Sequence, residues 1–148
     1  MEDICLQGSR QGNSSKPSQE LSDIIKNDAI YKPIFVKISP DESLKNLKAI
    51  FKSILSNNKD GIICSNTTID HDNENGLGGL SGAPLKTKSN SSLEKIKHIL
   101  GDKLPIIASG GVMTSEDYLE KLDKGANLVQ IYTGFIFEGP KLIKDILN

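Results

Sequence analysis

Four short apolar runs alternate along this chain with longer amphipathic stretches, and this alternation restricts the possible fold more than any other feature. The runs, which are candidate strands, are IFVKI (34–38), GIICS (61–65), PIIAS (105–109) and NLVQI (127–131). Apolar residues at helical spacing follow them and predict helices over 44–55, 93–100, 115–124 and 140–146. Because parallel strands need connections of this length, the pattern predicts an α/β fold with helices covering a parallel sheet.

Residues that favour helix ends flank three of these helices. Asp41 or Ser43 is placed to cap the first helix, and Gly101 ends the second in a position suited to a left-handed cap. Thr114, with Asp117 three residues later, resembles a capping box at the start of the third. The ends of these helices are therefore predicted by capping residues as well as by the spacing of apolar residues.

The repeating part has the size expected for half of a closed barrel. Residues 32–148 hold four βα units of about 29 residues, and eight such units would approach the roughly 250 residues of a (β/α)8 barrel. Residues 1–31 are interpreted as a loose N-terminal arm, because the stretch 7–23 is polar and rich in Ser, Gln and Gly. Half a barrel leaves two sheet edges and an apolar inner face open. The chain is thus expected to be a partial copy or to pair with another half.

Composition excludes several kinds of partner. Hydrophobic residues make up 36% of the 148 residues and charged residues 25%, which is typical of a soluble globular unit with its own core. A net charge of -1 with scattered basic residues gives no footprint for nucleic acid. Cys64 lies in an apolar run far from Cys5, which favours a buried reduced thiol. His71 has no second ligand at metal spacing, and both His71 and His98 are expected at the surface. No membrane-spanning run and no targeting segment are recognisable.

Two loops at one edge of the predicted sheet are candidates for binding a phosphate. Gly110 and Gly111 follow the third strand, at the edge where barrels of this type build their active sites. Without Cβ atoms, their N–H groups can approach an anion, and the start of the next helix would add a favourable dipole. Tyr132, Thr133 and Gly134 follow the fourth strand and offer a hydroxyl and further N–H groups. The glycine pair alone indicates an ordinary tight turn, but the two loops together favour a phosphate site.

Other polar residues are expected at the same edge. Lys37 lies within an apolar strand, where an anionic ligand would be its partner unless the side chain extends to the rim. Asn66 belongs to SNTT (65–68), which suits an amide or carboxylate ligand, although such clusters are more often ordinary turns. The irregular segment 69–89 contains GLGGLSG (76–82), whose glycines would admit a flat ligand or form a solvated flap.

Four segments, taken together, carry a specific family resemblance. They are KPIFVKISPD (32–41), SNTT (65–68), GGLSGAPLK (78–86) and PIIASGGVMTSEDYLEKLDKGANLVQIYTGFIFEGP (105–140). In order and spacing they resemble the C-terminal half of dihydroorotate dehydrogenase, and most closely its quinone-dependent, membrane-associated class (class 2). The resemblance spans residues 32–148 and implies the C-terminal half of a (β/α)8 TIM barrel.

The family implies an activity and its partners. Its members are FMN-containing barrels that oxidise dihydroorotate to orotate in de novo pyrimidine biosynthesis, and this class passes the electrons to ubiquinone. Its membrane association, at the mitochondrial inner membrane in eukaryotes, depends on an N-terminal helical part that has no match in this chain.

The resemblance also implies roles for eight residues. The FMN phosphate would be bound by Gly111, Tyr132 and Thr133. The flavin ring would contact Lys37, and Ser65 and Gly82 would line the cofactor. Asn66 and Thr67 would hydrogen-bond the pyrimidine substrate.

One expected residue has no match. The family's catalytic base, a serine in this class, belongs to the barrel half that precedes residue 32, and Ser9, Ser14 and Ser15 lie in no matching motif. We therefore expect a C-terminal fragment that carries much of the FMN site and part of the substrate site and is inactive as an isolated chain. Two alternatives stay open: a non-catalytic truncated product with a residual FMN-binding or assembly role, and a different FMN barrel enzyme.

Overall fold

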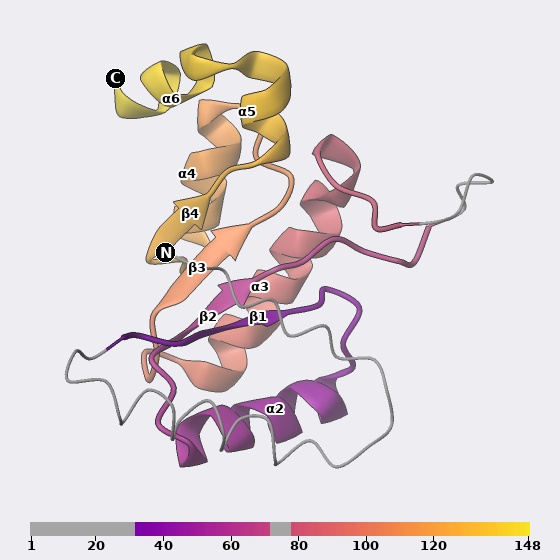
Figure 1. Ribbon diagram of the computed structural model, residues 1–148, viewed down its shortest axis with the longest axis vertical. Coiled ribbons are helices and arrows are strands. Elements are labelled where there is room, and N and C mark those ends of the chain that lie inside the picture. The colour runs from indigo at the N-terminus through magenta and orange to yellow at the C-terminus, as the bar shows by residue number, and fades with distance from the viewer. Residues whose placement is uncertain (1–31, 72–77) are drawn as a thin grey trace.

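The fold is an open parallel sheet with helices packed along it (Figure 1). The computed structural model describes residues 32–71 and 78–148. Its elements, in chain order, are β1 (Phe35–Ile38), α2 (Leu44–Ser56), β2 (Gly61–Cys64), the 3-10 helix η1 (Ala83–Leu85), α3 (Lys86–Leu100), β3 (Ile106–Ser109), α4 (Ser115–Asp123), β4 (Leu128–Gln130), α5 (Thr133–Glu138) and α6 (Pro140–Leu147). The strands pair in the order β1-β2-β3-β4, and every pairing is parallel. The four predicted strands and the α/β class are confirmed.

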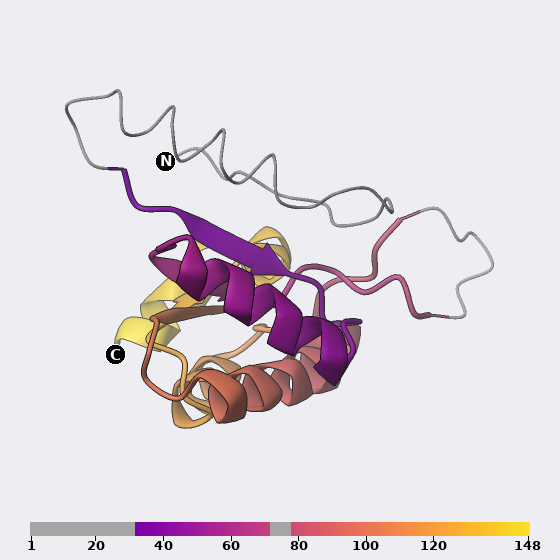
Figure 2. The same ribbon diagram turned by 90° about the horizontal axis from the view of Figure 1, so that it is seen from below.

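One face of the sheet carries the core. Figure 2 shows α2 and α3 together on this face of the sheet. Four strand residues, Ile62, Cys64, Ile106 and Ala108, are fully buried in one cluster with apolar residues of these helices. Burial of each large aliphatic side chain contributes roughly 1.5–3 kcal/mol. This layer therefore supplies most of the stabilisation that holds the strands in register.

The opposite face of the sheet is only partly covered by the described residues. Because side chains alternate between the faces of a strand, the register places Lys37, Ile63, Ile107, Leu128 and Gln130 on this second face. Four of them are half-buried, and Leu128 is 62% exposed. An open inner face is the arrangement expected of a partial barrel.

The predicted helix ends agree with the structure. Ser43, rather than Asp41, caps α2, since the Asn46 N–H donates to its hydroxyl at 3.2 Å. Thr114 and Asp117 form the predicted capping box of α4. Gly101 ends α3 as predicted, with a φ of +59° in the region that favours glycine, but its ψ of -129° is not that of the predicted left-handed cap.

Two helices differ from the prediction. α3 begins at Lys86 rather than near residue 93, because its first turns bury polar residues such as Ser89 and Asn90, which interrupt the apolar periodicity. α5 occupies residues where the sequence predicts a loop after the fourth strand. A helix of six residues is too short to show a helical repeat, so periodicity does not reveal it.

Part of the sequence analysis concerns residues outside the described ranges. The predicted arm (1–31), with Cys5, and residues 72–77 of the glycine-rich segment belong to this part, so the arm and the boundary at residue 32 stay predictions. Within 32–71 and 78–148, the structure contains no helix with the length and apolar character needed to cross a membrane.

Candidate functional site

A cavity of about 120 Å³ opens where the strands end at the carboxyl edge of the sheet. The eight residues singled out by sequence all line it: Lys37, Ser65, Asn66, Thr67, Gly82, Gly111, Tyr132 and Thr133. A complete small-molecule site usually has a volume of roughly 300–1,000 Å³. The described residues therefore form part of the walls of a site of that size, and the individual roles of the eight residues stay predictions.

Three loops meet around the cavity. A Cβ atom on Gly134 would overlap the carbonyl oxygen of Val112, so the turn after β4 lies directly against the turn after β3. A Cβ on Gly82 would lie 2.9 Å from Thr133 Cγ2, and the Thr133 hydroxyl donates to Ser81 Oγ at 3.1 Å. The segments after β2, β3 and β4 are thus in contact with one another.

Backbone conformation and close packing both require glycine at positions 110 and 111. Both residues have positive φ, +100° and +76°. A Cβ on Gly111 would overlap Lys86 Cα and lie 2.7 Å from Lys86 N, and a Cβ on Gly110 would lie 2.8 Å from Leu85 Cδ2. Packing against the start of α3 therefore explains the glycine pair without a ligand. What the turn offers to the cavity is its N–H groups, and no described residue accepts a hydrogen bond from the Gly111 N–H.

The N-terminus of α4 does not take part in the cavity, contrary to the expectation that its dipole would assist an anion. The carboxylate of Asp117 accepts the N–H groups of Met113, at 2.9 Å, and of Thr114, at 3.0 Å, and forms an ion pair with Lys86 at 2.5 Å. Burial of Asp117 opposes its ionisation, but these hydrogen bonds and Lys86 lower the pKa of the carboxyl below its ordinary value. The helix start is thus occupied by its own carboxylate, and the part of the β3–α4 segment that lines the cavity ends at Val112.

Two buried polar atoms in the cavity wall have no partner among the described residues. They are the hydroxyl of Ser65, a residue 2% exposed, and the side-chain oxygen of Gln130. Lys37 is half-buried beside them, and no ion pair or hydrogen bond joins its ammonium group to another described residue. A buried polar atom without a partner costs about 1–3 kcal/mol, so a polar ligand would be stabilised at this wall.

Sequence reasoning missed Gln130, Ser81 and Ser109, which also line the cavity. Gln130 and Ser109 are register partners on the same inner face as Lys37. Gln130 and Ser109 could have been found by the pattern that indicated Lys37, because each is a polar residue at an inward position of an apolar strand.

The loop after β2 is anchored by a charged cluster. The Thr68 hydroxyl and the Ile69 N–H donate to the carboxylate of Asp41, at 2.5 and 2.9 Å, and Lys88 pairs with Asp41 at 2.5 Å. Burial opposes ionisation of Asp41, but the bonds from Lys88, Thr68 and Ile69 outweigh it and lower the pKa of this carboxyl. The cluster fixes the segment that carries Asn66 and Thr67.

Cys64, His71 and His98 do not line the cavity. Cys64 is buried and free, as predicted, and burial raises the pKa of its thiol to about 11. His98 is exposed on α3, and His71 Nε2 lies 3.1 Å from the Gly78 carbonyl oxygen. Within the described part of the chain, no three His, Cys, Asp or Glu residues are grouped so as to bind a metal ion. The cavity wall therefore offers hydroxyl and amide groups and the ammonium of Lys37 to a polar or anionic ligand.

Comparisons with known proteins agree with the geometry. A family profile described as dihydroorotate dehydrogenase matches residues 7–148, and so extends into the predicted arm. A dihydroorotate dehydrogenase (quinone) of Shewanella denitrificans is 44% identical over 124 residues, which are 80% of this chain and 37% of that protein. The enzyme of the same name from Vibrio parahaemolyticus is 43% identical over 135 residues, 86% of this chain and 40% of that protein.

Solved structures give the same result. The structure of Eimeria tenella DHODH in complex with ferulenol matches with a TM-score of 0.72 and 32% identity, covering 81% of this chain and 34% of that one. The ligand-free Eimeria tenella enzyme matches with a TM-score of 0.70 and 34% identity, covering 76% and 33%. The chain spans well under half the length of these relatives. With its four parallel βα units forming part of the family's barrel, the chain belongs to the dihydroorotate dehydrogenase family, and its relatives are of the quinone-dependent class.

Proposed function

We propose that this chain supplies the FMN-binding part of the active site of a quinone-dependent dihydroorotate dehydrogenase. Such an enzyme oxidises dihydroorotate to orotate in pyrimidine biosynthesis and passes the electrons to a quinone at a membrane. The observation that carries the proposal is the meeting of the turns after β3 and β4 around one cavity, whose wall holds polar atoms without partners.

The residues fit the chemical groups of FMN. The Gly111 N–H and the Tyr132 hydroxyl are donors of the kind that a phosphate needs, and they belong to loops in mutual contact. The Thr133 hydroxyl, which donates to Ser81 Oγ in the structure, would turn its proton to the phosphate. On the inner wall, Lys37 offers a cation, and Ser65 and Gly82 leave a polar, narrow surface for a ring system. Bound FMN would accept the hydride, while these residues bind the cofactor and orient it.

The substrate would lie beside the loop after β2. Asn66 and Thr67 offer amide and hydroxyl groups that can pair with a pyrimidine ring, and the Asp41–Lys88 cluster holds their loop in place. Because the family's serine base has no match in this chain, proton removal from the substrate would need a group from another part of the enzyme.

A comparison of FMN with riboflavin tests the phosphate site. We expect the purified chain to quench FMN fluorescence with a dissociation constant at least about tenfold lower than that for riboflavin, since roughly 1.4 kcal/mol of phosphate binding corresponds to this ratio. Thr133→Val should weaken FMN binding and leave riboflavin binding unchanged. Thr87→Val, an exposed threonine of α3 away from the cavity, is the matched control. Equal affinity for FMN and riboflavin would refute the phosphate site.

Turnover is a separate question. We expect no dihydroorotate-dependent dye reduction by the isolated chain with saturating FMN, because the family's serine base has no match in it. Reduction by the chain alone would contradict this expectation. FMN binding that dihydroorotate and orotate leave unchanged would instead favour the alternative of a non-catalytic FMN-binding piece.

A further inference from the structure

A lysine is buried behind the Gly110–Gly111 turn, on the side away from the cavity. Lys121 of α4 is 1% exposed, although lysine is among the residue types least often buried. Its Nζ donates to the Ser89 hydroxyl of α3 at 2.6 Å. Neither residue lines the cavity, so the site described above does not account for the burial of this charge.

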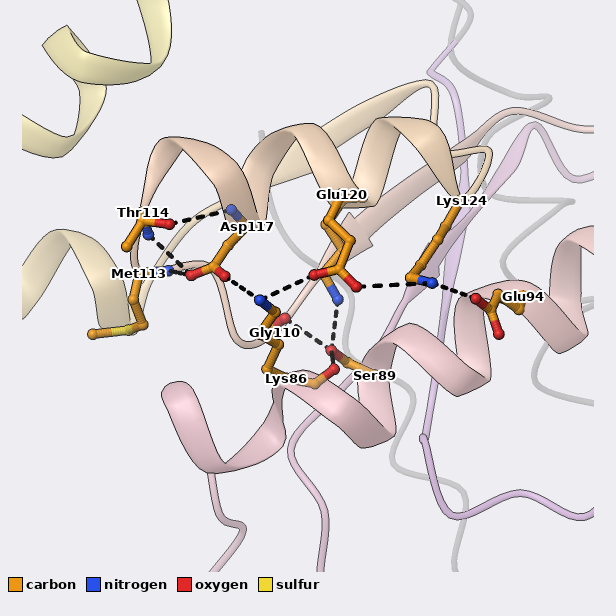
Figure 3. A network of polar contacts seen from close by, with 10 residues as sticks. Lys86, Ser89, Glu94, Gly110, Met113, Thr114, Asp117, Glu120 and Lys124 are labelled. Atoms are coloured by element: carbon orange, nitrogen blue, oxygen red, sulfur yellow. Dashed lines mark hydrogen bonds and ion pairs between the residues drawn. The ribbon is translucent and has the colours of Figure 1, made fainter.

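Ser89 connects this lysine to the turn. Its hydroxyl oxygen lies 2.9 Å from the Gly110 carbonyl oxygen and 3.0 Å from the Lys86 carbonyl oxygen. An ammonium group can only donate, so Ser89 Oγ must accept from Lys121, and its single proton is left to donate to a carbonyl. Figure 3 shows Ser89 and Lys86 of α3 beside the Gly110 carbonyl, below α4.

The orientation of one peptide plane follows from this contact. In a trans peptide the C=O of one residue and the N–H of the next point in opposite directions. Because the Gly110 carbonyl points toward Ser89 in the helix layer, the Gly111 N–H points away from that layer. Two glycines in succession have little intrinsic preference for one orientation, so an external contact has to set it.

We propose that Lys121 and Ser89 are positioning residues for the Gly110–Gly111 turn, holding its peptide so that the Gly111 N–H faces an anion in the cavity. The identity of that anion as the FMN phosphate rests on the proposed function. Because the ammonium donates to Ser89 Oγ, the Ser89 proton is available to the Gly110 carbonyl, which is slightly nearer than the Lys86 carbonyl. The ammonium also adds a positive charge behind the turn. A deprotonated Lys121 could accept the Ser89 proton instead and release the carbonyl.

The charges around Lys121 allow its titration to be observed separately. Burial lowers the pKa of Lys121 to about 8. The groups facing it are Cys64 of β2, Lys86 of α3, and Asp117 and Glu120 of its own helix. Burial raises the Cys64 pKa to about 11, the two carboxylates raise the Lys86 pKa, and Lys86 helps to lower both carboxyl pKa values. Between pH 6.5 and 9.5, therefore, only Lys121 of this group changes its charge.

The test compares Lys121→Met with Lys124→Met. Lys124 is in the same helix and pairs at the surface with Glu94 and Glu120, so the two variants change the net charge equally. Replacing a buried charge by an apolar side chain of similar length is often neutral or stabilising, so Lys121→Met should fold. We expect the 15N order parameter of Gly111 to be near 0.85 in the wild type and in Lys124→Met, and below about 0.6 in Lys121→Met.

A measurement on the wild type removes any dependence on the variant folding. The Gly111 amide resonance should shift between pH 6.5 and 9.5 with the midpoint of the Lys121 ammonium signal.

FMN affinity, measured by fluorescence quenching, should fall about tenfold in Lys121→Met, with riboflavin affinity unchanged. A tenfold loss corresponds to one lost hydrogen bond.

The outcomes separate the inference from the proposed function. An ordered Gly111 in Lys121→Met, or a Gly111 amide that does not follow Lys121 in the wild type, would overturn the positioning role. A wild-type chain that binds neither FMN nor inorganic phosphate would overturn the proposed function, while the ligand-free order parameters would still decide the role of Lys121. A purely structural Lys121 would show itself as a large loss of stability in Lys121→Met with Gly111 still ordered.

Discussion

Replacing Gly111 by alanine should destabilise the chain much more than the same change at Gly101. Both residues have positive φ, +76° and +59°, so alanine at either position costs about 1–3 kcal/mol of backbone strain. At Gly101 the position of a new Cβ has no heavy atom within 4 Å. At Gly111 the Cβ would overlap Lys86 Cα and lie 2.7 Å from Lys86 N, in backbone that cannot rotate away. Such overpacking costs about 1–3 kcal/mol more.

Urea unfolding followed by circular dichroism measures the difference. The midpoint multiplied by the slope gives the free energy of unfolding of each variant. We expect Gly101→Ala to lose about 1–3 kcal/mol and Gly111→Ala about 2–6 kcal/mol, out of the 5–15 kcal/mol of a typical domain. Equal losses in the two variants would refute the packing explanation of the glycine pair.

Three further predictions concern the charged and capping residues. Because native Lys121 loses its proton near pH 8 while the unfolded chain keeps it to about 10.5, the wild type should gain about 1 kcal/mol of stability relative to Lys121→Met between pH 7 and 9; a constant difference in urea midpoints would contradict the lowered pKa. Thr114→Ala should cost about 1 kcal/mol through loss of the α4 cap, and an unchanged thermal midpoint would argue against that cap. Asp41→Asn should accelerate amide hydrogen exchange at Ile69, whose N–H donates to Asp41, whereas exchange at Leu47 in α2 serves as the reference; equal protection in the wild type and the variant would exclude the anchoring role of Asp41.

The strands are easy to recognise in the sequence because each one is a short, nearly continuous run of apolar residues. Each strand is four residues or fewer, and its burial follows from the parallel sheet itself. Helix faces were harder to predict. The apolar positions of α4 are Tyr118, Leu119 and Leu122, yet Leu119 is 55% exposed while Asp117 and Lys121 are buried. Burial there is decided by Lys86 and Ser89 of another helix, and no pattern within α4 contains that information.

The sequence predicts which edge of the sheet carries the polar residues of the cavity, but it does not predict the contacts among them. Each strand end contributes polar or small residues at a known edge, so Gly111, Thr133 and Ser65 could be placed together from topology. The reason for glycine at position 111 lies in the approach of Lys86, which is 25 residues distant along the chain and visible only in the folded molecule. The same holds for the Thr68–Asp41 contact, which joins two loops across 27 residues.

The contact between Gly134 and Val112 couples two walls of the cavity. At the junction of the two turns there is no space for a single methyl group, and Leu142 of α6 supports it from behind, 3.0 Å from where a Gly134 Cβ would be. The two turns therefore hold each other in place, and a shift of one would displace the other. The hydrogen bond from Thr133 to Ser81 extends this contact to the segment after β2, so a ligand that displaces one of the three segments would disturb the other two.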